Sequence, residues 1–131
     1  MRVLLDTHTF LWFVSDLTKL RRESLKILER NDCDAQISIA SIWEISIKTS
    51  TGKLSVAGGF PSVETDLANN SIRTLPISFA HALTNNLLTF HHKDPFDRMI
   101  AAQAIVEGID LVSKDDIFDS YFTDTEVKRI W

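Results

Sequence analysis

Four acidic residues of this sequence are the best candidates for chemistry: Asp6, Glu44, Asp97 and Asp115. Carboxylates supply the oxygen ligands that Mg²⁺ and Mn²⁺ prefer. One or two such ions can activate a water, orient it and neutralise the charge that develops during hydrolysis of a phosphodiester. Without metal, clustered carboxylates repel one another, which predicts that some of their pKa values are raised.

Each of these acids also has an ordinary structural interpretation. Asp6 and Asp115 follow short apolar segments and suit turns or helix N-caps. Asp97 lies three residues after another aspartate, a pair that resembles a capping box. Glu44 precedes Lys48 by four residues, the spacing of a surface ion pair on a helix. The residues alone leave both interpretations open.

The elements expected to position these acids alternate between strands and helices. Buried strands are expected where short, largely apolar segments occur, over residues 2–5, 35–39 and 109–112, with a shorter one over 72–75. Helices are expected over residues 10–14, 20–31, 61–69 and 78–88. Residues 41–48 are ambiguous, because Ile45 and Ile47 also fit a period of two; we favour a helix on length and on the need to cross back over the sheet.

The clearest element is a helix that starts at Asp94. Asp94 suits the N-cap, Pro95 suits the first helical position, and Gly108 can end the helix. Residues 99–106 are apolar and rich in alanine, which predicts a buried helix that packs closely against its neighbours.

The order of elements predicts an α/β sandwich around a mostly parallel sheet. Ligands bind such sheets beyond the carboxyl ends of the strands. If the strands that precede Asp6 and Asp115 are neighbours, both carboxylates reach one crevice. Asp97 would then point into that crevice from a rigid helix end.

Length and composition are those of one folded domain over residues 1–131. Hydrophobic residues make up 44% and charged residues 24% of the chain, which is ordinary for a globular protein. The net charge of −4 counts against simple electrostatic docking of phosphates, but not against an enzyme that gathers carboxylates. The lone Cys33, the lack of a signal peptide and the lack of a long apolar run suggest a cytoplasmic protein without a membrane segment.

The histidines carry a weaker signal than the acids. His8 could line a site beside Asp6, whereas His81 fits a packing role within a helix. His91 and His92 lie in a polar loop, where a solvated pair is the default expectation. No HExxH, paired Cys/His spacing, GxGxxG, P-loop or GxSxG pattern is present, so zinc, nucleotide and serine-hydrolase chemistry lack their usual support.

Four short segments, in this order, resemble PIN-domain proteins and in particular the VapC-type toxins of bacterial toxin–antitoxin pairs. They are LLDTH at 4–8, SIWEI at 41–45, HKDPFDR at 92–98 with the helix that follows at 99–104, and LVSKD at 111–115. The resemblance extends from Val3 to about Phe118. Each segment is weak alone, but four in order at suitable spacing are fairly specific.

The resemblance implies a three-layer α/β/α PIN-like sandwich and an endoribonuclease that depends on Mg²⁺ or Mn²⁺. The acidic quartet matches position by position: Asp6 and Asp97 as the principal metal ligands, Glu44 and Asp115 completing the site directly or through water. Ser113 stands where many members carry threonine, and its hydroxyl could orient Asp115. Because Asp116 is adjacent, which of the two aspartates is used stays open.

The resemblance also implies an RNA substrate, a small cognate antitoxin protein and a homodimer. The antitoxin segment would lie in a groove near the acids. Apolar candidates for that groove are Phe10, Trp12, Phe13 and Leu20, although an apolar stripe is more often core. Basic candidates for RNA phosphates are Lys48, Lys53, Lys93 and Arg98.

Two other classes of protein remain as alternatives. A receiver-like signalling domain also gathers acids and Mg²⁺ at strand ends, to accept a phosphoryl group. It normally shows paired acids after the first strand, whereas Asp6 is followed by Thr7 and His8. A PIN-like module that binds RNA or protein without cleaving has no need of all four acids.

Overall fold

A five-stranded sheet with the strand order β3-β2-β1-β4-β5 forms the centre of the computed structural model, which describes all 131 residues. The strands are β1 (Arg2–Leu5), β2 (Asp34–Ser38), β3 (Arg73–Leu75), β4 (Asp110–Val112) and β5 (Arg129–Ile130). Every neighbouring pair is parallel, so the expected mostly parallel sheet is parallel throughout. Parallel strands need crossover connections, and these place helices on both faces.

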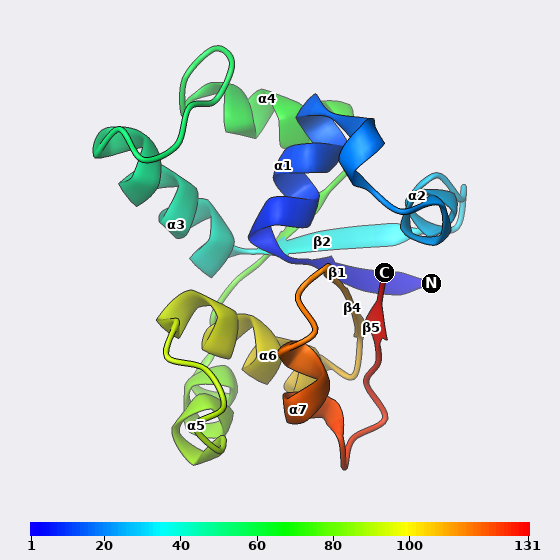
Figure 1. The fold of residues 1–131 in the computed structure, drawn as a ribbon, viewed down its shortest axis with the longest axis vertical. Helices are drawn as coiled ribbons and strands as arrows, with labels where there is room; N and C mark the ends of the chain where they lie inside the picture. The colour runs from blue at the N-terminus through cyan, green and yellow to red at the C-terminus, as the bar shows by residue number, and fades with distance from the viewer.

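Seven α-helices and one short 3₁₀ helix complete the fold. They are α1 (Thr7–Ser15), η1 (Leu17–Lys19), α2 (Arg22–Leu28), α3 (Ile39–Ser50), α4 (Ser62–Asn69), α5 (Phe79–Leu87), α6 (Pro95–Glu107) and α7 (Phe118–Phe122). In Figure 1, α1, α3 and α4 lie on one side of the sheet, and α5, α6 and α7 lie on the other. The expected three-layer α/β/α sandwich is confirmed.

Two hydrophobic cores fill the spaces between these layers, one on each face of the sheet. Alternation along β1 divides its residues between them. Val3 and Leu5 pack with Phe10 of α1 and Ile45 of α3. Leu4 points the other way and packs in the core that α6 and α7 share.

The helix predicted to start at Asp94 is confirmed in detail. The Asp94 carboxylate accepts hydrogen bonds from the backbone N–H groups of Phe96 and Asp97, at 2.9 and 3.2 Å. Gly108 ends α6 with a left-handed φ of 64°, a conformation that glycine adopts without steric cost. The ambiguous segment 41–48 is also helical, as favoured, and lies within α3.

The boundaries of three other elements were predicted wrongly. The helix expected over 10–14 begins at Thr7, because Asp6 caps it. The helix expected over 20–31 covers only Arg22–Leu28, as α2, because Leu20 is extended and follows η1. The strand expected over 35–39 ends at Ser38, whose hydroxyl accepts a hydrogen bond from the Ala40 N–H and so caps α3.

Two elements near the C-terminus had no sequence signal. The helix α7 has five residues and β5 has two, so neither is long enough to show a periodic pattern. No helix has both the length and the apolar character that a membrane crossing requires.

Candidate metal centre

Asp6 lies at the carboxyl end of β1 and faces the end of β4, because the two strands are neighbours in the sheet. Its carboxylate caps α1 by accepting from the Thr9 N–H at 2.7 Å, and it also accepts a hydrogen bond from the Ser113 hydroxyl. The side chain is buried, and burial raises its pKa above the ordinary value, against the lowering effect of these two donors. Asp6 is therefore both a helix cap and a buried acid.

Asp97 occupies the first turn of α6, but its carboxylate does not complete a capping box. Because Asp94 caps the helix, Asp97 Oδ2 is free to contact His92 Nε2, at 2.9 Å. Desolvation, and then repulsion by Asp94, Asp6 and Glu44, raise the pKa of Asp97 to about 7, although the contact with His92 lowers it. The predicted repulsion among the acids is thus present at this residue.

Glu44 projects from α3 with its side chain almost fully buried. Its Oε1 accepts from the Thr7 hydroxyl at 2.6 Å, and its Oε2 pairs with Lys48 Nζ at 2.7 Å. The i,i+4 ion pair that the spacing suggested therefore exists. It differs from the expected surface pair because the Glu44 carboxylate is buried, while only Lys48 reaches the surface.

Asp115 lies in the exposed loop between β4 and α7. Its Oδ1 accepts from the Ile117 N–H at 3.1 Å, and its own N–H donates to the Ser113 hydroxyl at 3.0 Å. Ser113 therefore contacts the backbone of Asp115, and its expected role in orienting the side chain of this residue stays a prediction. Asp116 is exposed beside it, and both aspartates line a cleft of about 430 Å³ together with Asp6 and His8.

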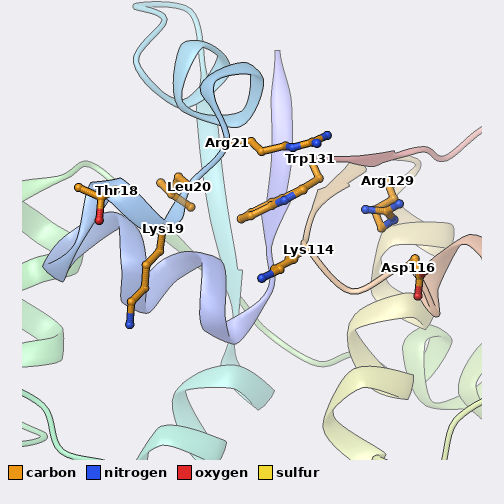
Figure 2. Close-up of a pocket in the computed structure, with 8 residues that line it drawn as sticks. All are labelled: Thr18, Lys19, Leu20, Arg21, Lys114, Asp116, Arg129 and Trp131. Atoms are coloured by element: carbon orange, nitrogen blue, oxygen red, sulfur yellow. The ribbon is translucent and has the colours of Figure 1, made fainter.

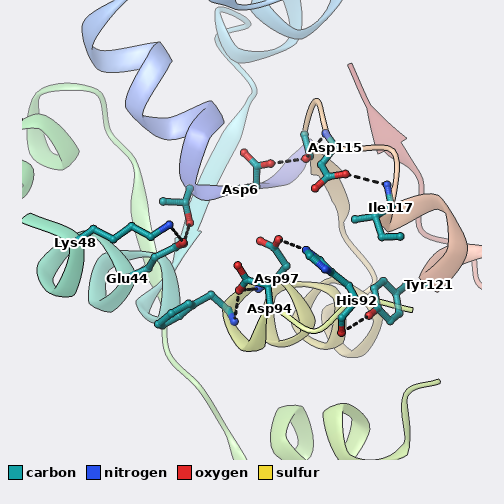
Figure 3. Close-up of polar contacts among 12 residues, drawn as sticks. Asp6, Glu44, Lys48, His92, Asp94, Asp97, Asp115, Ile117 and Tyr121 are labelled. Atoms are coloured by element: carbon teal, nitrogen blue, oxygen red, sulfur yellow. Dashed lines mark hydrogen bonds and ion pairs between the residues drawn. The ribbon is translucent and has the colours of Figure 1, made fainter. Parts of the chain in front are cut away.

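The acidic residues face a common space at the carboxyl edge of the sheet (Figure 3). Asp6 and Asp115 enter it from the ends of β1 and β4, Glu44 from α3, and Asp97 from the start of α6. The charges of Asp6 and Glu44 are close enough to affect the pKa of Asp97. Asp115 is connected to Asp6 through Ser113.

His92 and Asp94 were missed as possible metal ligands. With Asp97 they offer ligand atoms that all lie within 4.8 Å of one another. The default of a solvated histidine pair is wrong for His92, which contacts Asp97, while His91 packs edge-on against Tyr121. The only signal in the sequence was three ligand-type residues within six positions at a helix start.

The donor set of this region suits a hard divalent cation. Its members are mainly carboxylate oxygens, which Mg²⁺ and Mn²⁺ prefer. They are held by separate elements, and one of them, Asp97, has a pKa raised by burial and then by negative neighbours. A bound cation would relieve that repulsion.

Several peripheral predictions were wrong. Arg98 is buried: its guanidinium donates to the carbonyl oxygens of Asn85, Leu88 and Thr89 at the end of α5, so it is not available to RNA phosphates. Phe10 belongs to the buried core rather than to a groove, whereas Leu20 is largely buried but lines a cleft together with Arg21 and Trp131. Of the two other apolar candidates, Phe13 packs against the core, whereas Trp12 is half-buried and lines the acidic cleft, as expected for a groove near the acids.

His81 has the packing role that was expected. It is buried, shares a capping box with Ser78, and its Nε2 lies 2.9 Å from a carboxylate oxygen of Glu107. His8 lines the acidic cleft, also as expected.

The fold and the site together define an α/β/α sandwich with an acidic centre at the carboxyl edge of a parallel sheet. The family model described as PIN domain matches residues 3–121, and the chain therefore belongs to the PIN domain family. Members of this family are typically nucleases. Comparison with curated proteins gives no match.

Solved structures with the same fold cover nearly the whole chain. VapBC2 from Rickettsia felis, bound to a DNA fragment from its promoter, matches with a TM-score of 0.70 and 16% identity over 99% of this chain and 98% of that chain. VapBC-5 from Mycobacterium tuberculosis matches with a TM-score of 0.65 and 17% identity over 98% and 97%. VapC20 of Mycobacterium tuberculosis is described as a toxin that cleaves the sarcin–ricin loop. It matches with a TM-score of 0.58 and 12% identity over 92% of this chain and 95% of that chain.

Proposed function

We propose that this chain is a metal-dependent endoribonuclease of the VapC type, the toxin of a toxin–antitoxin pair, with residues 1–131 forming one PIN domain. The observation that carries the proposal is the position of Asp97 at the carboxyl edge of the sheet, where burial and then the charges of Asp94, Asp6 and Glu44 raise its pKa to about 7. A cluster of acids with only a structural role would be expected to hold its carboxylates apart. A site for a divalent cation instead brings carboxylates together, and perturbed pKa values are typical of such functional sites.

In this proposal Asp6 and Asp97 are the principal ligands of Mg²⁺ or Mn²⁺, and Glu44 and Asp115 complete the site directly or through water. The bound ion supplies a water of lowered pKa and a positive charge beside the phosphate. The chain's own residues hold that arrangement. Thr7 fixes Glu44, Ser113 fixes Asp6 and the Asp115 backbone, and Asp94 holds the helix end from which Asp97 projects.

His92 adds a neutral or cationic partner to Asp97. A contact of this kind orients a ligating carboxylate and adjusts its basicity. Alternatively its ring nitrogen joins Asp94 and Asp97 as a ligand, since the three lie within 4.8 Å of one another. We treat His92 as a positioning residue of the proposed site.

The antitoxin partner and the homodimer are also proposals. Support for an antitoxin comes from the similar fold of several toxin–antitoxin complexes. For the homodimer, the measurement is the mass in solution by light scattering: twice the chain mass is expected, and one chain mass at all concentrations would contradict it.

The decisive experiment is cleavage of structured RNA with Mn²⁺ or Mg²⁺ by the wild type, Asp6→Asn and Asp97→Asn. We expect cleavage that EDTA abolishes and that both substitutions reduce strongly. Asp124→Asn is the matched control, because Asp124 is exposed after the end of α7 and does not line the acidic cleft. If the two site variants cut like the control, the assignment fails.

Membership of the PIN family removes the support for a receiver-like domain. A module that binds without cleaving remains the competing function. It predicts RNA binding that persists in Mn²⁺ with no shortening of the RNA, so the same assay separates the two.

A further inference from the structure

A second cleft, of about 650 Å³, lies beside the acidic one and is rich in basic residues. Figure 2 shows Lys19 and Arg21 on the segment that follows α1, Lys114 on the loop after β4, and Trp131 at the end of β5. Lys114 and Asp116 line both clefts. A ligand that fills one cleft can therefore extend into the other.

The positive charges of this cleft are largely uncompensated. Lys19, Arg21 and Lys114 are exposed and have no ion-pair partner in the structure, whereas Asp116 is the one acid in the lining. Arg129 also lines the cleft, but its guanidinium is bound to the Asp119 carboxylate and the Ser113 carbonyl. Three cationic side chains thus face one acidic side chain in a chain whose net charge is −4.

Aromatic rings connect this cleft to the acidic one. Trp131 packs against Trp12 with ring centroids 5.9 Å apart, and Trp12 packs against His8 at 5.7 Å. Trp12 and His8 line the acidic cleft, and Lys114 Nζ lies 6.0 Å from the centre of the Trp12 ring. The two tryptophans are half-buried, so part of each ring is accessible.

We propose that this basic–aromatic cleft binds the single-stranded RNA segment next to the phosphodiester that is cut. The inference rests on the proposed ribonuclease function and names where its substrate is held. Interleaved cations and aromatic rings suit a single strand, because phosphates bind the cations while bases stack on the rings. Without a bound cation the acidic centre repels phosphates, so affinity of the metal-free protein for RNA must come from a neighbouring surface, and this cleft provides one.

An acidic protein segment is the competing ligand, since it would also use the three cations. The aromatic rings favour RNA, because carboxylates gain nothing from the face of a tryptophan ring, which carries negative charge density. The two ligands therefore differ in how strongly they depend on Trp131.

The test measures binding of a fluorescein-labelled 12-nucleotide single-stranded RNA by anisotropy, in EDTA so that no cleavage occurs. Lys19→Ala combined with Arg21→Ala is compared with Lys26→Ala combined with Lys128→Ala, which removes the same charge from exposed positions outside the cleft. Loss of two phosphate contacts should make the slope of log Kd against log salt shallower by about 1.4 and weaken binding roughly tenfold at low salt. The control pair should keep the wild-type slope.

Trp131 is tested by Trp131→Ala and Trp131→Phe. Loss of one stacked base should weaken RNA binding by roughly 5- to 100-fold in the alanine variant, and phenylalanine should restore most of it. In a Trp43→Phe background, where Trp12 and Trp131 are the only tryptophans, RNA should quench the tryptophan emission of the protein with an intact cleft. The same quenching should require more RNA when Lys19 and Arg21 are also replaced.

The proposal is overturned if the cleft and control pairs bind RNA with the same Kd and salt slope. It is also overturned if a 12-residue oligoglutamate binds as tightly as RNA and loses as much affinity on Lys19/Arg21 substitution, which would identify a site for an acidic protein. If the protein cleaves RNA in Mn²⁺ and the cleft variants bind RNA as the wild type does, the proposed role of the cleft is refuted but the ribonuclease function is not. Cleft-dependent RNA binding with no cleavage would instead refute the ribonuclease function.

Discussion

The Ser113 hydroxyl donates a hydrogen bond to the Asp6 carboxylate and accepts one from the Asp115 N–H, at 3.0 Å in the second case. The two partners lie on different elements, one after β1 and the other after β4. This single buried hydroxyl therefore connects two of the four proposed ligands across neighbouring strands. It also satisfies one oxygen of a carboxylate that burial makes costly to ionise.

Replacing Ser113 with alanine should weaken both the fold and the site. The hydrogen bond lowers the pKa of Asp6, so its loss raises that pKa further and leaves a buried oxygen without its donor. We expect the free energy of unfolding to fall by about 1–3 kcal/mol and Mn²⁺ to bind more weakly. Urea unfolding and calorimetric titration measure the two effects. Ser113→Thr keeps the hydroxyl and should behave like the wild type; equal losses in both variants would show that packing, not the hydroxyl, matters.

The raised pKa of Asp97 predicts an unusual pH dependence for the metal-free protein. Its ordinary value is 3.8 and its value in the fold is about 7, so between these pH values the folded state holds a proton that the unfolded state has lost. Stability from this group therefore falls as pH rises from about 4 to about 7 and is constant above that. Denaturant unfolding in EDTA across this range should show the trend, and Asp97→Asn, which cannot ionise, should lose it. A wild type and variant with parallel profiles would contradict the assigned pKa.

Metal affinity should change in the opposite direction over the same range. A proton on Asp97 competes with the cation for its oxygen, so Mn²⁺ should bind more tightly as pH rises through about 7 and Asp97 becomes ionised. The rise in melting temperature on adding Mn²⁺ measures this by mass action. A rise that is the same at pH 5.5 and pH 8 would count against Asp97 as a ligand.

The central part of the site could be predicted because its acids follow elements with strong local signals. β1 is a short buried strand that ends at Asp6, and α6 has an aspartate cap, a proline in its first turn and a glycine at its end. Glu44 was harder, because Ile45 and Ile47 fit either period and only the crossover requirement favoured a helix. In each case the structural interpretation is confirmed, because Asp6 caps α1 and Glu44 pairs with Lys48, while the functional interpretation stays a proposal.

What could not be predicted depends on tertiary contacts that leave no local sequence pattern. His92 becomes a partner of Asp97 only because its loop folds back over the start of α6. Arg98 follows Asp97 directly, yet helical geometry turns it toward the end of α5, where three carbonyl oxygens bind it. The basic–aromatic cleft combines residues about 110 positions apart, Lys19 and Trp131, through a two-residue strand that shows no pattern.

His92 should affect the metal site although it was not among the four predicted acids. His92→Ala removes the contact that lowers the pKa of Asp97, so that pKa should rise and Mn²⁺ should bind roughly 10- to 100-fold more weakly. NMR titration of the Asp97 carboxyl and calorimetry measure the two quantities. The matched control is His91→Ala, because His91 packs on Tyr121 and does not contact the acids. If both alanine variants bind Mn²⁺ alike, His92 has no part in the site.

Lys48 should act as an internal competitor of the metal. Its ammonium lies 2.7 Å from Glu44 Oε2, and its pKa is raised by that contact and by the charges of Asp94 and Asp97. The raised pKa means that its stabilising effect is fully present at neutral pH and is lost only as pH rises through the folded value. In Lys48→Ala the free energy of unfolding of the metal-free protein should fall by roughly 1 kcal/mol, a value discounted because the ammonium is partly exposed.

The freed Glu44 oxygen should then bind Mn²⁺ about fivefold more tightly, which corresponds to about 1 kcal/mol. Calorimetric titration of the two lysine variants Lys48→Ala and Lys53→Ala checks this, since Lys53 carries the same charge in an exposed loop and forms no ion pair. Equal Mn²⁺ affinity in the two variants would show that Glu44 does not take part in binding the ion.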